Sequence, residues 1–199
     1  IIEQSGAGQV AGLASPTASL EEAYLLQKLL SELGVNNLDH RVRQQDFSDD
    51  AVNYDLDVAL SDIEASDTVL IVGSAIRREQ PILAHRIRQA ALSGTRVNEL
   101  NFFENDLLMP VDTQLALNIE SMLDHLSGIA KALFPLAKTD ESAWTKVLSG
   151  VVPEAADQTI AMQLSNADKA TIIVGDLAKN HPDASKIKAV LALIARLSG

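Results

Sequence analysis

Residues 68–100 read TVLIVGSAIRREQPILAHRIRQAALSGTRVNEL and decide the predicted fold. The run 68–72 is apolar, mostly β-branched and closes at Gly73, which is typical of a central strand covered on both faces of a parallel sheet. Pro81 suits the first turn of a helix, and residues 97–100 supply a second strand. A strand, a helix and a strand in this order predict a right-handed crossover in a parallel sheet.

Two further helices are predicted from their ends. Ser19 and Glu22 have the spacing of a capping box, which opens a helix that Gly34 would end. Asp112 is the predicted N-cap of the longest helix, whose apolar residues recur at gaps of three and four until Pro135 ends it.

A second copy of the strand pattern occurs near the end of the sequence. Residues 171–175 read TIIVG and are followed, like 68–73, by a loop with a proline and then a helix. This repetition suggests two related α/β lobes, although a strand, a glycine loop and a helix also recur in such folds without duplication.

The overall composition excludes several classes of function. The sequence has 199 residues, a formal net charge of −11 and 47% hydrophobic residues, which suits one domain or two small lobes and disfavours nucleic acid and anionic membranes as partners. Cysteine is absent, which excludes disulfides, thiolate metal sites and cysteine nucleophiles within these residues. Because the sequence begins without Met and ends just after a helix, we expect it to be a fragment of a longer chain.

Gly6, Gly8 and Ala11 have the G-x-G-x-x-A spacing of a dinucleotide-binding turn. Such a turn must join a buried strand to a helix. Only four residues precede Ser5, and Gly12 and Pro16 would interrupt a following helix. We therefore interpret this stretch as a leader into a short strand within residues 9–15.

No catalytic or metal-binding residues are predicted. The histidines have no metal-ligand spacing and are expected in surface or capping roles: His40, His85, His125 and His181. The acidic stretch 44–57 does not match a calcium loop, which favours a solvated surface loop over a cation site. The sequence also lacks a Walker A motif and a G-x-S-x-G elbow.

The weak candidates for a cofactor or anion site lie in the loop after the first buried strand: Gly73, Ser74, Arg77 and Arg78. Loops after parallel strands line the ligand crevice of open α/β sheets. The alternative is that the two arginines form salt bridges with the acidic surface or a neighbouring subunit, and Glu79 would oppose an anion at the same place.

The segments GLASPTASLEEAYLLQKLLSELGVNNLDHRVR and DIEASDTVLIVGSAIRREQPILAHRIRQAALSGTRVNELNF carry a family resemblance. They resemble the molybdopterin oxidoreductase-type region of the large iron–sulfur subunit (the G subunit) of bacterial NADH:quinone oxidoreductase, respiratory complex I. The resemblance covers most of the chain. It implies a fold like that of formate dehydrogenase and DMSO reductase: Rossmann-like, doubly wound parallel sheets with helices on both faces, one lobe inserted into a second, incomplete α/β lobe.

On this resemblance, residues 14–135 form the inserted lobe, and residues 1–13 with 136–199 belong to the second. The 4Fe–4S and 2Fe–2S clusters of the family are held by cysteines in the N-terminal part of the full-length subunit, so none is expected here. Relatives that bind a pterin often show an Asp-Pro-Arg type motif after the strand ending at Asn101, and this sequence does not. The resemblance therefore implies no cofactor and no catalytic residue in this fragment.

The resulting hypothesis is a non-catalytic scaffold region that supports electron transfer from NADH to quinone. Its implied partners are other peripheral-arm subunits, on the cytoplasmic side of the bacterial inner membrane and without membrane insertion. The alternatives are a molybdopterin- or nucleotide-binding oxidoreductase domain that uses the loops after Gly73 and Gly175, and an interaction module whose acidic surface makes the contact.

Overall fold

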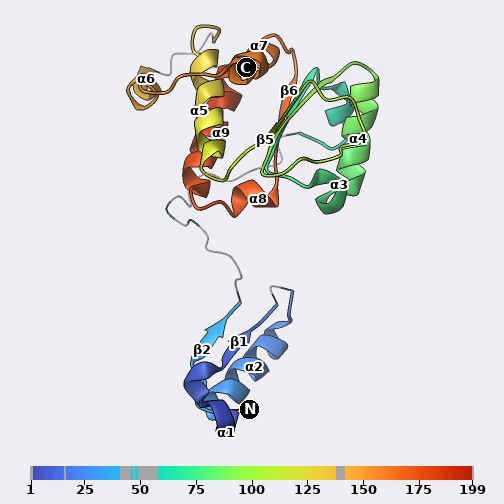
Figure 1. Ribbon diagram of the computed structural model, residues 1–199. Coiled ribbons are helices and arrows are strands. Elements are labelled where there is room, and N and C mark those ends of the chain that lie inside the picture. The colour runs from blue at the N-terminus through green and yellow to red at the C-terminus, as the bar shows by residue number, and fades with distance from the viewer. Residues whose placement is uncertain are drawn as a thin grey trace. The chain divides into compact units, whose positions relative to one another are not determined.

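The computed structural model describes residues 2–15, 17–40, 46, 48, 58–137 and 142–198. The chain falls into two compact units, Ile1–Gln44 and Gln45–Gly199. Each unit is described by itself, with the elements labelled as in Figure 1.

The smaller unit is built from a strand, a helix and a strand. β1 (Ala11–Leu13) and β2 (Asn37–Asp39) pair in parallel, and α2 (Leu20–Glu32) connects them. The short α1 (Ile2–Ser5) and the 3-10 helix η1 (Ala7–Gln9) come before β1. Gly12 allows close packing of β1 against α2, because a Cβ there would lie 2.2 Å from Cδ1 of Leu30.

Both ends of α2 are closed by local hydrogen bonds, as predicted. The hydroxyl of Ser19 accepts the backbone N–H of Glu22 at 3.3 Å, and the Glu22 carboxylate accepts the backbone N–H of Ser19 at 2.8 Å. The bonds from the backbone and hydroxyl of Ser19 hold the pKa of Glu22 below its ordinary value. Gly34 has a φ of 75°, and the N–H of Val35 returns to the carbonyl of Leu30 at 2.8 Å.

The G-x-G-x-x-A residues do not form a dinucleotide-binding turn. Gly6 lies between α1 and η1, Gly8 is within η1, and Ala11 begins β1. The fingerprint requires a strand before the glycines and a helix after them, and here a helical turn precedes a strand. The interpretation as a leader into a short strand is confirmed.

The larger unit contains a four-stranded parallel sheet in the order β5-β4-β3-β6. Its strands are β3 (Thr68–Val72), β4 (Arg96–Asn101), β5 (Thr113–Ala116) and β6 (Ala170–Val174). β3 lies between β4 and β6, with Val69 opposite both Val97 and Thr171. All five residues of β3 are buried, as the continuous apolar run predicts for a central strand.

Helices cover both faces of this sheet (Figure 1). One face packs against α4 (Pro81–Leu92), together with α3 (Ile76–Glu79) and η2 (Ile63–Ala65). The other packs against α5 (Ser121–Leu133), α7 (Ala155–Ser165) and α9 (Ala184–Ser198), with α6 (Ser142–Val147) and α8 (Asp176–Lys179) at their ends.

Alternate residues of each strand supply the two cores. Val69 and Val97 belong to the cluster on the α4 side, whereas Leu70 and Leu100 belong to the cluster with α5, α7 and α9. The predicted class, a Rossmann-like α/β fold with a parallel sheet between helices, is confirmed.

The predicted helix start at Asp112 is wrong. Residues 113–116 form β5, and α5 begins only at Ser121. The Asp112 carboxylate accepts the backbone N–H of Val97 at 3.2 Å, so it caps the sheet edge and not a helix. Leu115 satisfies the helical spacing by chance, because pairing of β5 with β4 decides its conformation.

The chain is also divided at a different place from the one predicted. The family resemblance implies that β6 belongs to a second lobe with residues 136–199, but Ile172 on β6 lies opposite Leu70 on β3 in one sheet. β1 pairs with β2 in the smaller unit. The two similar strand motifs are therefore neighbours in a single sheet, because the chain returns through α5 and α7 to the free side of β3.

Candidate functional site

The predicted candidate residues lie where an open α/β sheet would hold a ligand. The chain passes from β3 to β4 and β5 on one side and returns to β6 on the other. This reversal places the topological switch point at the carboxyl ends of β3 and β6. Gly73 and Gly175 each follow one of these strands, so both predicted candidate loops lie at this edge of the sheet.

The chain itself fills the space between these two loops. A Cβ on Gly73 would lie 2.8 Å from the Cβ of Ala178, and one on Gly175 would lie 2.3 Å from the Cβ of Ser74. The carbonyl of Gly73, whose φ is 57°, accepts the N–H of Leu177 at 3.0 Å. Because neither glycine has a side chain, the backbone of the loop after β3 packs directly against the backbone of the loop after β6.

In the loop after β3, the carboxylate of Glu79 accepts hydrogen bonds from the donors that a ligand could otherwise use. The Ser74 hydroxyl donates to Oε2 of Glu79 at 2.8 Å, and the backbone N–H of Ala75 donates to Oε1 at 2.8 Å. A hydroxyl and a backbone N–H at the start of a helical turn are groups that often bind an anion. Here Glu79 takes both, in agreement with its predicted opposition to an anionic ligand.

A second buried carboxylate extends this network along the sheet edge. Glu99 on β4 is fully buried. Its oxygens accept amide hydrogen bonds from Asn101 at 3.1 Å, Asn105 at 2.9 Å and Gln114 at 2.6 Å. Asn101 and Asn105 also donate to the carbonyl of Ser74, at 2.8 and 3.2 Å. The polar groups at this edge therefore satisfy one another.

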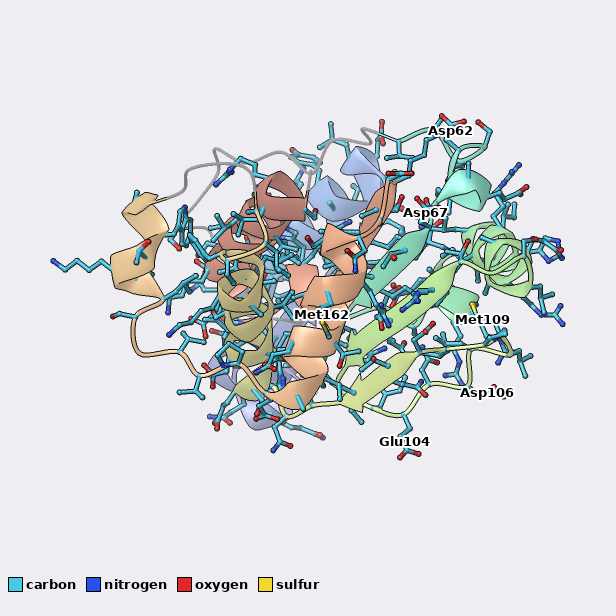
Figure 2. The ribbon with its side chains drawn as sticks, turned by 90° about the horizontal axis from the view of Figure 1, so that it is seen from above. Asp62, Asp67, Glu104, Asp106, Met109 and Met162 are labelled. Carbon is cyan, nitrogen blue, oxygen red and sulfur yellow. The ribbon has the colours of Figure 1, made fainter. Side chains whose placement is uncertain are left out.

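One of the two arginines, Arg77, is paired with the loop after β4. Arg77 donates to the backbone carbonyl of Asp106 at 2.6 Å and lies 3.8 Å from the Asp106 carboxylate, in the loop after β4 (Figure 2). Both partners are substantially exposed, so this ion pair contributes about 0–1 kcal/mol. Arg78 is exposed. The salt-bridge alternative is confirmed for Arg77.

Sequence reasoning missed the role of Glu99. It considered Glu79 only as a charge that would oppose an anion, and not as the acceptor for Ser74 and Ala75. The signal was present in residues 96–101, which read RVNELN and place polar side chains in a strand expected beside the buried strand 68–72. A buried carboxylate requires partners, but those partners come from residues up to fifteen positions away.

The described parts of the chain contain no group of three or more His, Asp or Glu residues arranged to hold a metal ion.

Two histidines have structural roles inside the larger unit. His125 hydrogen-bonds Asp157 at 2.8 Å. His181 is buried, accepts the N–H of Asp183 at 2.9 Å and lies 2.8 Å from the carbonyl of Ile119. His181 is therefore not on the surface, where the sequence analysis expected it unless it capped a helix. The acidic stretch 44–57 lies outside the described residues, apart from Asp46 and Ser48.

No described helix is both long and apolar enough to cross a membrane.

Curated proteins that are similar to this chain include two oxidoreductases. One is the probable oxidoreductase YjgC of Bacillus subtilis (strain 168), 31% identical over 147 residues, which are 70% of this chain and 15% of that protein. Another is the G subunit of the NADH-quinone oxidoreductase of Rickettsia felis (strain ATCC VR-1525 / URRWXCal2), 31% identical over 90 residues, which are 44% of this chain and 13% of that protein. The chain therefore matches only a small part of the length of either relative.

The family model for molybdopterin oxidoreductases matches residues 1–199, the whole of the chain. This agrees with the parallel α/β sheet and with the resemblance seen in the sequence. The chain belongs to the molybdopterin oxidoreductase family.

Proposed function

We propose that this chain is a scaffold region, without catalytic residues of its own, of the large iron–sulfur subunit of an NADH:quinone oxidoreductase. Its role is to support the path of electrons from NADH to quinone by holding neighbouring subunits of the peripheral arm. The similarity to a subunit of an NADH-quinone oxidoreductase supports the choice of complex.

The proposal rests on the carboxyl ends of β3 and β6, where residues of the chain itself fill the space that a ligand would need. A pterin cofactor with its phosphate needs open space and donors at the loops after β3 and β6. Those loops pack Gly73 against Ala178, and Glu79 presents a negative charge where the phosphate would lie. The residues present therefore do not fit the cofactor, and no chemical step is assigned to it.

Iron–sulfur clusters are likewise assigned to other parts of the subunit. Such clusters are bound by cysteine thiolates, and the 199 residues include no cysteine. On this proposal, the 4Fe–4S and 2Fe–2S clusters lie in the N-terminal part of the full-length subunit. The subunit is placed peripherally, on the cytoplasmic side of the bacterial inner membrane.

Two measurements test the proposal: the metal and pterin content of the chain, and its association with other subunits. The chain, produced in cells supplied with molybdate, is analysed for iron and molybdenum and for pterin fluorescence after oxidation. We expect none of the three at stoichiometric level, and co-sedimentation with purified peripheral-arm subunits. Stoichiometric pterin, or failure to associate with any of those subunits, would overturn the proposal.

A second candidate function is a molybdopterin- or nucleotide-binding oxidoreductase domain. The similarity to YjgC over 70% of the chain favours it, since that protein is described as a probable oxidoreductase. The two candidates are separated by thermal unfolding in the presence of a guanine nucleotide or NADH. A ligand at one hundred times its dissociation constant stabilises a protein by about 2.7 kcal/mol, whereas the scaffold proposal expects no shift.

A further inference from the structure

A cavity of about 640 Å³ lies at the edge of the sheet opposite the loops described above. It opens at the amino ends of β3 and β4, beside Asp67 and Arg96, and α7 forms its other wall. Figure 2 shows Met162 on α7 and Asp67 just before β3. A volume of this size is within the range of small-molecule sites, roughly 300–1,000 Å³.

One face of α7 is turned toward this cavity. Thr159, Met162, Gln163 and Asn166 all line it and recur at gaps of three and four residues, which is the spacing of neighbours on one helical face. Met162 is 51% exposed there. The wall thus combines a large apolar side chain with a hydroxyl and two amides.

An incompletely satisfied polar pair lies behind this wall. Asn98 on β4 is fully buried, and its Nδ2 donates to Oε1 of Gln163 at 2.7 Å. Within the part of the chain that the structure describes, Oδ1 of Asn98 accepts no hydrogen bond. Polar side chains without full pairing are unfavourable in an otherwise apolar layer between sheet and helix. Of these two residues, Gln163 lines the cavity and Asn98 does not.

The charges at the cavity have opposite signs. Arg96 is exposed, and its guanidinium makes no ion pair with any described residue. Asp67 accepts the N–H of Lys169 at 2.9 Å through Oδ2, and Glu64 pairs with Arg86 at 2.9 Å. A polyanion would meet both carboxylates and a protein of net charge −11. A small zwitterion matches the cation and the carboxylates together.

We propose that this cavity binds a free amino acid. Arg96 would hold its carboxylate, the side of the cavity with Asp67 would receive its ammonium group, and the amides of Gln163 and Asn166 would hydrogen-bond a polar side chain. The proposal is independent of the scaffold function, because the two sites lie at opposite edges of the sheet.

The test is a titration of the whole chain with L-glutamine, L-asparagine, L-serine and L-glutamate, followed by calorimetry and by backbone amide NMR shifts. We expect saturable binding of at least one amino acid with Kd below about 1 mM, and shifts concentrated at residues 93–96 and 159–167. N-acetylation of that amino acid, which removes the ammonium charge, should weaken binding about tenfold.

Arg96→Gln should weaken binding about two- to fivefold, since one exposed charge pair is lost. Arg78→Gln is the matched control, because it removes another exposed guanidinium at the opposite edge of the sheet, and it should leave Kd unchanged. The shift map needs no variant, so it decides the case even if Arg96→Gln unfolds. No saturable binding, or shifts located elsewhere, would overturn the proposal.

Discussion

Nδ1 of His125 on α5 lies 2.8 Å from Oδ1 of Asp157 on α7, and Asp157 is only 2% exposed. The second oxygen of this carboxylate accepts the N–H of Glu154 at 2.9 Å, which caps the start of α7. Gly128 makes room for it, because a Cβ there would lie 2.3 Å from Oδ2. One buried carboxylate therefore both begins a helix and joins it to its neighbour.

Asp157→Ala should destabilise the larger unit by about 1–3 kcal/mol, because it removes a helix cap and leaves His125 without its partner. Urea unfolding measures the effect. His125→Ala and the double variant complete a thermodynamic cycle, in which we expect a coupling of about 0.5–3 kcal/mol. Asp124→Ala, an exposed position on α5, should change stability by less than about 0.5 kcal/mol. A coupling near zero would show that the two side chains act separately.

Glu99→Gln should also destabilise the fold by about 1–3 kcal/mol. Three amide groups donate to the carboxylate, and a glutamine amide would set a donor against at least one of them. Glu104→Gln makes the same chemical change in the loop after β4, at a side chain that is exposed (Figure 2). Equal unfolding midpoints for the two variants would contradict the role given to the network.

Gly73→Ala should destabilise the larger unit by about 1–3 kcal/mol, since alanine at a φ of 57° is strained and its Cβ would meet Ala178. Gly150→Ala is the control, because open space surrounds that glycine. Thermal unfolding compares them. If Gly73→Ala were as stable as the control, the sheet edge would have room for a ligand, and the scaffold proposal would lose its main support.

Asp46 should make the larger unit more stable at neutral than at acid pH. Its carboxylate accepts hydrogen bonds from the hydroxyls of Ser185 and Ser48 and from both backbone N–H groups, and these bonds hold the pKa of Asp46 well below its ordinary value of 3.8. A lowered folded-state pKa gives stability that is complete above the unfolded pKa and is lost as the pH falls through the folded pKa.

Asp46→Asn should therefore be less stable than the wild type at pH 7, and the difference should shrink as the pH falls below about 3.8. Urea unfolding at several pH values measures this. Asp168→Asn, at an exposed carboxylate, should track the wild type throughout. A difference that stayed constant down to the lowest pH would exclude the proposed role of the charge.

Several features were predictable from the sequence because they depend on neighbours along the chain. The capping box at Ser19 and Glu22 needs residues three positions apart. The buried strand 68–72 and the helix after Pro81 follow from unbroken apolar character and from helical periodicity. Each of these predictions is confirmed.

Other predictions failed where distant pairing decided the outcome. Asp112 and Leu115 fitted a helical pattern, but pairing with the free edge of β4 makes residues 113–116 a strand. The position of β6 beside β3 depends on how α5 and α7 cross the sheet, and short-range patterns carry no information on that.

The sequence by itself determined the α/β class, the order of strand and helix after residue 68, the lack of thiolate ligands and the edge of the sheet where a ligand would be sought. Only the tertiary structure decided that this edge is filled by Ala178 and Glu79, that Glu99 is satisfied by three amides and that a cavity lies at the opposite edge. The reason is physical: periodicity and capping act within a few residues, whereas burial and hydrogen-bond satisfaction depend on which distant segments meet.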